Sequence, residues 1–204
     1  MKSRILCASL LICCAAFARQ EASTPVDVYM QSDNALWAFI WPAKALVSEI
    51  FARIGVSITW HEALSPLDRK GVHNDTGRPA FTIRWLERVP ASASGIALAA
   101  AHPFNYSGPE VAIYEDQLQQ YLKQHPDVQN VALAYILAHE LAHVMQGIDR
   151  HSDSGILKAE WSRSDRFQMV FHKLAFTPED VDLIHCGLDA RASGWAQASG
   201  TGTL

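Results

Sequence analysis

Strands and one helix are predicted in the first half of the chain. Apolar and polar residues alternate over four short stretches, and a run of small apolar residues is compatible with an exposed edge strand. These patterns predict strands over 26–29, 56–60, 81–85 and 111–114, with the edge strand over 95–101. Between the first two strands, apolar residues recur with helical period, and Pro42 predicts a kink there or a division into two shorter helices.

Helical patterns dominate the second half of the chain. Residues 116–124 predict a short helix. The next helix, over 128–146, is apolar on almost every side, with Asp127 as its N-cap and Gly147 as its end. A helix that is apolar all round is buried within its domain. Polar groups on such a helix therefore need a partner or a bound ion.

The last predicted helix begins with Thr177 as its N-cap and runs to about Ala192, where Ser193 and Gly194 can stop it. The glycine-, serine- and threonine-rich residues 194–204 then predict a flexible tail. The predicted elements make one domain over residues 19–193, a length that allows a sizeable core.

The first 18 residues have the pattern of a secretory signal peptide. Lys2 and Arg4 precede an apolar run over 6–16, and an A-x-A sequence ends at Ala18. The apolar run is too short to cross a bilayer, which takes about 20 residues. The sequence thus predicts cleavage near Ala18 and a secreted or periplasmic protein without a membrane span.

Charge and cysteine content limit the classes of partner and of fold. The formal net charge is −4, and the loss of Lys2 and Arg4 would make the mature chain more acidic, which argues against a nucleic-acid partner. Of the four cysteines only Cys186 lies beyond the signal peptide, so an internal disulfide is excluded in the mature chain. Cys186 itself is expected to be a buried apolar residue on the last helix.

The buried helix carries the H-E-x-x-H pattern of zinc peptidases at His139, Glu140 and His143. Residues four apart lie on one face of a helix, about 6 Å apart along its axis, so both imidazoles can reach one ion. Glu140 follows the first histidine directly and sits beside the ion, where a carboxylate can act as a general base on water. The pattern predicts a Zn²⁺ site with His139 and His143 as ligands.

A catalytic zinc site usually has three protein ligands and a water molecule. His151 is the leading third ligand, because Gly147 ends the helix and lets the chain turn back. Glu160 is the main alternative, and a glutamate supplied by a second helix is typical of gluzincins, although their accompanying pattern is missing here. Asp149 and Asp153 are weaker alternatives that fit better as partners of the histidines.

With these residues the segment resembles the metzincin clan of zinc peptidases, whose pattern is HExxHxxGxxH. The glycine and the third histidine each come later here, at Gly147 and His151. The segment is also similar to uncharacterised secreted bacterial proteins with HExGHxLLGxxxHSxxGIMRAxW. The corresponding positions here are HExxH over 139–143, Gly147, His151-Ser152, GILKA over 155–159 and Trp161. This resemblance implies an α+β zincin-like domain with a mixed twisted sheet, a backing helix, a central active-site helix and a C-terminal helix.

Metzincins place a methionine turn beneath the metal, and Leu157 stands in the corresponding position. Leu157 is therefore expected either to form an apolar floor under the histidines or to be ordinary core. Lys158 replaces an arginine of the similar proteins and is either a substrate-orienting cation or a solvated side chain.

The resemblance implies a secreted zinc peptidase that hydrolyses peptide bonds of a peptide or protein substrate, with Glu140 as general base. The substrate would pair with the edge strand within 95–101. The alternative is an exported zinc-binding protein without catalytic activity.

Overall fold

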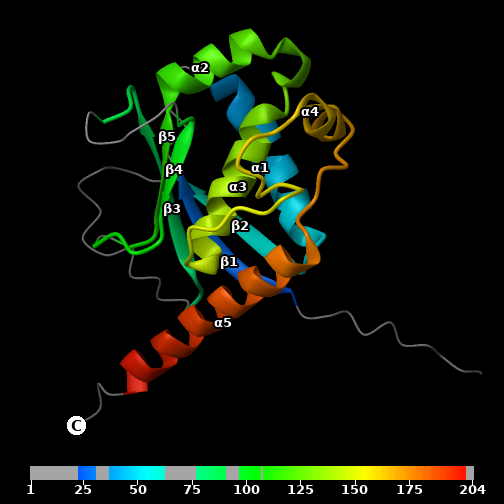
Figure 1. The fold of residues 1–204 in the computed structure, drawn as a ribbon. Coiled ribbons are helices and arrows are strands. Elements are labelled where there is room, and N and C mark those ends of the chain that lie inside the picture. Colours follow the sequence, from blue (N-terminus) through cyan, green and yellow to red (C-terminus); the bar gives the residue numbers. More distant parts are fainter. Residues whose placement is uncertain (1–22, 31–36, 63–76, 91–96, 107, 201–204) are drawn as a thin grey trace, which may run out of the picture.

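A five-stranded mixed sheet forms one layer of the molecule (Figure 1). The computed structural model of the 204-residue chain describes residues 23–30, 37–62, 77–90, 97–106 and 108–200. The strands are β1 (Thr24–Met30), β2 (Val56–Glu62), β3 (Ala80–Leu86), β4 (Ala99–His102) and β5 (Glu110–Tyr114). They lie in the order β2-β1-β3-β5-β4. Only β4 is antiparallel to its neighbour, and it forms an edge of the sheet.

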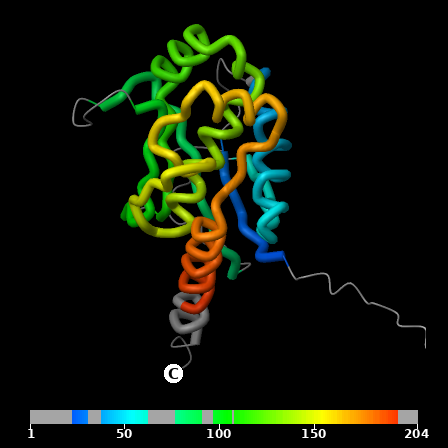
Figure 2. Tube along the Cα trace, turned by 45° about the vertical axis from the view of Figure 1, so that its right-hand side comes forward, coloured from blue at the N-terminus to red at the C-terminus, as the bar shows by residue number. Residues whose placement is uncertain are grey.

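Helices cover one face of this sheet and its two ends (Figure 1). They are α1 (Trp37–Ala52), α2 (Glu115–Gln124), the 3₁₀ turn η1 (Pro126–Val128), α3 (Ala132–Gln146), α4 (Arg163–Val170) and α5 (Pro178–Gly200). α1 and α3 pack against each other and against the sheet, and α3 also contacts α5. The view turned by 45° shows α5 leaving the body of the molecule below α3 (Figure 2). The expected mixed sheet, backing helix, central helix and C-terminal helix are all present.

The core lies between the sheet and the helix pair. In β1, Val26, Val28 and Met30 alternate along the strand and are fully buried, which is the period expected when one face of a strand meets helices. Every residue of α3 is buried except Glu140, which is half-buried. The central helix therefore exposes to solvent, in part, only the side chain that follows its first histidine.

Two helices differ from the sequence prediction: α1 in its interior, at Pro42, and α3 in the residue at which it begins. α1 is one continuous helix through Pro42. Pro42 is the sixth residue of α1, so its missing N–H leaves only the carbonyl of Ala38, in the first turn, without an intrahelical partner. α3 begins at Ala132, so Asp127 is not its N-cap but part of η1. A helix buried on all sides has no periodic polar face to mark where it begins.

The eight-residue helix α4 was missed. Its start has a capping box, in which the Ser162 side chain accepts from the backbone N–H of Asp165 and the Asp165 side chain accepts from the Ser162 N–H. The S-x-x-D pattern at these two residues was the available signal. Lys158 donates to the same Asp165 carboxylate at 2.7 Å, so this lysine is ion-paired.

The last helix begins as predicted and ends later. Thr177 Oγ1 accepts from the Asp180 backbone N–H at 3.2 Å, which makes it the expected N-cap. α5 does not stop at Ser193 and Gly194 but continues to Gly200. Cys186 is exposed, contrary to the prediction, because the buried face of α5 is formed by its neighbours at 180, 184 and 188.

The signal-peptide prediction, residues 1–18, lies outside the described residues, as do residues 201–204 of the predicted tail. Among the helices of the described part, none combines the length and the apolar character needed to cross a bilayer.

Candidate metal centre

The two histidines of α3 meet at the buried end of the helix. His139 is 8% exposed and His143 is 5% exposed, and the Nε2 atoms of the two rings lie 3.1 Å apart. α3 ends at Gln146, and its C-cap Gly147 adopts the left-handed conformation with φ of 72°. One turn of helix thus brings two buried imidazoles together, and their rings meet edge-on with centroids 4.7 Å apart.

Backbone carbonyls fix which ring nitrogens face each other. His139 Nδ1 lies 2.9 Å from the carbonyl oxygen of Ile156, and His143 Nδ1 lies 3.3 Å from that of Ile148. A carbonyl can only accept, so each Nδ1 carries a proton and donates it. In the neutral rings both Nε2 atoms then present lone pairs to each other, which repel unless a cation or proton lies between them. This arrangement fits a shared metal ion, since metal-bound histidines usually donate their other ring N–H to such a partner.

Burial keeps both rings neutral. It lowers the pKa of His139 from 6.5 to about 4, with a smaller effect in the same direction from the neighbouring His143. It also lowers the pKa of His143, again with a further lowering from a histidine neighbour, His151. An unprotonated imidazole is the form that binds a metal, so the two rings are ready for one at neutral pH.

His151 completes the cluster from the loop that follows α3. Its ring centroid lies 5.3 Å from that of His139 and 5.0 Å from that of His143. One ligand atom from each of the three rings can be chosen so that all lie within 4.8 Å of one another. His151 is exposed, whereas the other two histidines are buried. Of the candidates for third ligand, the structure brings His151 to the histidine pair.

The carboxylates proposed as alternatives do not join this group. Among the described residues, the cluster with metal-ligand spacing at these histidines contains the three imidazoles alone. Glu160 is exposed and lines the neighbouring cavity, while Asp149 and Asp153 are exposed loop residues. Asp149 is nevertheless close enough to raise the pKa of Glu140.

The loop returns beneath the histidines through a second tight turn. Gly155 has φ of 78°, and a Cβ there would lie 2.4 Å from the carbonyl oxygen of Ala175, so only glycine fits. The next residue, Ile156, donates its N–H to that same oxygen at 3.0 Å and offers its own carbonyl to His139. Leu157 is completely buried beside it. Its predicted place directly under the metal stays a prediction.

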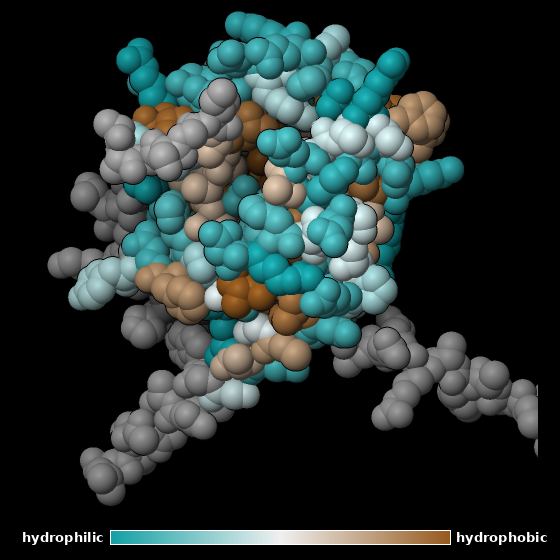
Figure 3. Space-filling view, viewed as in Figure 1, coloured by the Kyte–Doolittle hydropathy of each residue, from teal (hydrophilic) through white to brown (hydrophobic). Residues whose placement is uncertain are grey.

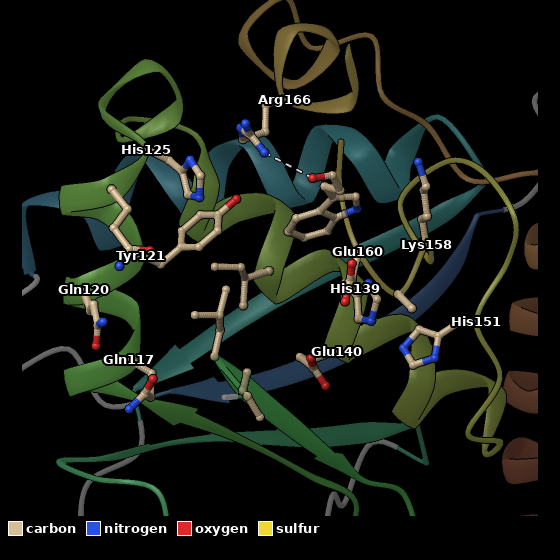
Figure 4. Close-up of a pocket in the computed structure, with 17 residues that line it drawn as sticks. Gln117, Gln120, Tyr121, His125, His139, Glu140, His151, Lys158, Glu160 and Arg166 are labelled. Atoms are coloured by element: carbon tan, nitrogen blue, oxygen red, sulfur yellow. Dashed lines mark hydrogen bonds between the residues drawn. The ribbon is translucent and has the colours of Figure 1, made fainter. Parts of the chain in front are cut away.

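Glu140 points into a cavity next to the histidines (Figure 4). Its carboxylate accepts a hydrogen bond from the backbone N–H of Ala101 in the edge-strand segment. Burial, with a smaller contribution from Asp149, raises the pKa of Glu140 from 4.5 to about 8. The cavity therefore contains a carboxyl group that binds a proton readily, beside a cluster of unprotonated imidazoles.

The cavity has a volume of about 540 Å³. One wall is the chain that leads into β4, from Ala97 to Ala99, a second is α2, and the third is the chain from Lys158 to Trp161. The space-filling view shows apolar surface inside the hollow beneath α2 (Figure 3). Polar side chains at Gln117, Gln120, Gln124 and His125 stand on the α2 side. A cavity of this size and mixed character suits a side chain or a short peptide segment.

Sequence reasoning identified the side chains of this centre but missed the groups that orient them. The carbonyls of Ile148 and Ile156 are backbone groups, which every residue has, so the sequence does not show which of them bind the histidines. Trp161 donates its indole N–H to the Ile156 carbonyl at 3.2 Å, and its ring meets that of His139 edge-on with centroids 5.7 Å apart. In the sequence, the only signal for Trp161 is its place as the last residue of the similar bacterial pattern.

No protein-family model matches the chain, and no curated protein matches it. Among solved structures, archaemetzincin from Methanopyrus kandleri is similar in fold over 84% of this chain and 99% of its own length. The two sequences are 14% identical and the TM-score is 0.47. A similarity of this degree does not bear on the activity of the chain, which has to be inferred from the side chains of the centre.

Proposed function

We propose that this chain is a zinc-dependent peptidase in which His139, His143 and His151 hold one Zn²⁺ and Glu140 acts as general base. The observation that carries the proposal is the pair of Nε2 atoms 3.1 Å apart, with each Nδ1 bonded to a backbone carbonyl. A zinc ion held there would polarise the scissile carbonyl and lower the pKa of a bound water to about 7.

Glu140 has the position and the chemistry for proton transfer. It follows a ligand directly, so it lies about 100° around the helix from His139 and reaches the cavity rather than the histidine cluster. The raised pKa of its carboxyl group shows that burial disfavours the charged form. A cation held by the histidines would act in the opposite direction and favour the carboxylate. Glu140 could then accept a proton from the attacking water and return it to the leaving amine.

The edge strand supports a peptide as substrate. The Tyr114 N–H donates to the Leu98 carbonyl at 3.0 Å, so Leu98 directs its backbone groups toward β5. Alternate residues of an antiparallel strand point these groups in opposite directions, so Ala97, Ala99 and Ala101 direct theirs away from β5. The hydrogen bond from the Ala101 N–H to Glu140 is in accord with this direction. An extended peptide could add to this edge, and the small side chains would let its backbone approach.

Export follows from the N-terminal sequence and belongs to the same proposal. Lys2, Arg4, the apolar run over 6–16 and the A-x-A sequence ending at Ala18 support cleavage and a secreted or periplasmic location. N-terminal sequencing of the protein recovered from outside the cytoplasm would test this part.

The direct test measures zinc and peptide hydrolysis in the same preparations of parent and Glu140→Gln protein. We expect one zinc per chain in both proteins and a turnover about 10²–10⁴-fold lower in the variant, the usual contribution of a general base. Glu49→Gln is a matched control, because Glu49 is exposed and, in the described part of the chain, its ion pair is with the exposed Arg53 just after α1. A broad peptide library serves as substrate, since the proposal does not specify a cleavage sequence.

The outcomes of this test are distinct. Equal turnover in Glu140→Gln would eliminate Glu140 as the base. A parent chain that holds zinc tightly and cleaves nothing in the library would support the zinc-binding protein without activity. A parent chain that takes up no zinc would overturn the proposal as a whole.

A further inference from the structure

The two residues that flank His151 bind one carboxylate. Arg150 Nη1 lies 3.2 Å from Asp180 Oδ1, and the Ser152 hydroxyl donates a short hydrogen bond to the same oxygen. Arg150 and Ser152 also bond to each other at 3.3 Å. His151 thus stands between two side chains that are fastened to Asp180 on α5, and Arg150 also pairs with the neighbouring Glu179. In Figure 1 the loop after α3 passes beside the start of this helix.

Asp180 is completely buried, at 0% exposure. Its second carboxylate oxygen accepts from the Thr177 backbone N–H at 3.0 Å, and its backbone carbonyl accepts from the Gln146 side chain at 3.3 Å. Gln146 is the last residue of α3, three residues after His143. Asp180 therefore connects the end of the helix that carries two histidines with the loop that carries the third.

A buried carboxylate is costly unless charge and hydrogen bonds compensate it. Here the compensation comes from Arg150, Ser152 and the N-terminus of α5. Because the ion pair and the hydroxyl bond are both directed, they restrict the path of the backbone at His151 more than packing alone would. Loss of either would let an exposed imidazole move away from the other two.

We propose that Asp180 is a positioning residue of the metal site, which clamps both neighbours of His151 so that its imidazole faces His139 and His143. This inference rests on the proposed zinc site, and it adds a residue that is not a ligand and lies 29 positions from His151 in sequence. Asp180, Arg150 and Ser152 form the clamp. The clamp acts on zinc through His151, whereas the negative charge of Asp180 also reaches His139 and His143.

Asp180 also belongs to the N-cap of α5, so its two roles have to be separated. Ser152→Ala removes one of the two side chains that hold the loop to Asp180 and leaves the cap intact. Thr177→Ala removes the hydroxyl that accepts from the Asp180 N–H and leaves the clamp intact. Asp180→Asn affects both. Asp182→Asn removes a neighbouring exposed acid from the same helix and controls for charge.

The experiment has two readouts. They are the zinc affinity, measured by competition with a chelator, and the unfolding free energy of metal-free protein. We expect Ser152→Ala and Asp180→Asn to raise the zinc dissociation constant about 10–100-fold, the usual effect of losing a group that orients a ligand. Thr177→Ala should lower the unfolding free energy with the dissociation constant unchanged, and Asp182→Asn should leave both unchanged.

A double-mutant cycle decides whether the effect passes through His151. In a His151→Ala background, Ser152→Ala should cause no further loss of zinc affinity, because the residue that it orients is already absent. An equal loss with and without His151, or parent-like affinity in both Ser152→Ala and Asp180→Asn, would overturn the clamp while the zinc site stands. A parent chain without zinc would overturn the zinc site and the clamp together.

Discussion

Trp161 and His139 donate their ring N–H groups to the same carbonyl oxygen, that of Ile156, at 3.2 and 2.9 Å. The tryptophan therefore holds the acceptor that fixes the tautomer of a proposed metal ligand. Its ring also packs edge-on against the histidine, with centroids 5.7 Å apart. One aromatic residue thus controls both the direction of the hydrogen bond and the room that the imidazole has to turn.

Replacing Trp161 with Phe should weaken zinc binding without emptying the site. Phenylalanine keeps an aromatic ring but has no N–H, so the Ile156 carbonyl is freer to move. We expect the zinc dissociation constant to rise by about tenfold, at the lower end of the range for orienting partners. Chelator competition on the purified protein would measure it. Trp60→Phe is a matched control. Trp60 lies on β2 and its indole N–H donates to Ser48, so this variant also loses an indole hydrogen bond. Equal affinity of the Trp161 variant and parent would contradict the prediction.

The metal-free protein should lose stability in mild acid because of His139. The pKa of His139 is lowered by burial from 6.5 to about 4 in the folded state, so between these values the unfolded chain binds a proton that the folded chain does not. Unfolding is then favoured as the pH falls from about 6.5 to 4, by roughly 3 kcal/mol. Urea unfolding of chelator-treated protein across this range would measure the slope.

His139→Asn should remove most of that slope, while His102→Asn, at an exposed position of β4, should keep it. A parent slope that survives in His139→Asn would mean that other groups cause the acid sensitivity.

Because of Glu140, the metal-free protein should also lose stability as the pH rises, which is the opposite pH dependence to that caused by His139. The pKa of its carboxyl group is raised by burial from 4.5 to about 8, so the folded state holds a proton that the unfolded chain releases. This contribution is present below pH 4.5 and is lost as the pH rises to about 8. Glu140→Gln stays neutral, so its advantage over parent should grow across this window to a few kcal/mol. Calorimetry of both proteins at several pH values would show it, and parallel curves would refute it.

Gly155→Ala should destabilise the protein strongly, because an added Cβ would lie 2.4 Å from the Ala175 carbonyl oxygen. Gly77→Ala is a matched control, since Gly77 has a similar positive φ of 67° but nothing within 4 Å of its Cβ position. The control should cost about 1–2 kcal/mol, the penalty of the left-handed conformation alone. The Gly155 variant should cost more than this and also bind zinc more weakly, as measured by denaturant unfolding and chelator competition. Similar costs at both positions would show that the close approach is unimportant.

Much of the fold was predictable from local patterns. The alternation predicted over 26–29 has a counterpart in β1, where Val26 and Val28 are buried and Tyr29 is partly exposed. The order of the strands was not predictable, because β1 pairs with both β2 and β3 through contacts that no local pattern encodes. The start of α3 was misplaced for a related reason, since burial on every side removes the polar face that marks a helix end.

The centre itself was predictable where one element carries it. His139 and His143 lie four residues apart on one helix, so their convergence follows from helical geometry. The choice between His151 and Glu160 was open in the sequence, because the path after Gly147 depends on contacts made much later in the chain. Those contacts are the hydrogen bond of Ile156 to Ala175 and the carboxylate of Asp180.

The uneven burial of the three imidazoles has a kinetic consequence. His139 and His143 belong to the helix that contacts α1, α5 and the sheet, so exposing them requires disruption of the core. His151 is exposed on a loop that the Asp180 clamp holds to α5, and local opening of a loop costs less free energy than global unfolding. A bound ion would therefore depart by a stepwise route that begins with the detachment of His151. The lifetime of the loaded protein would follow the opening rate of this loop rather than the unfolding rate of the domain.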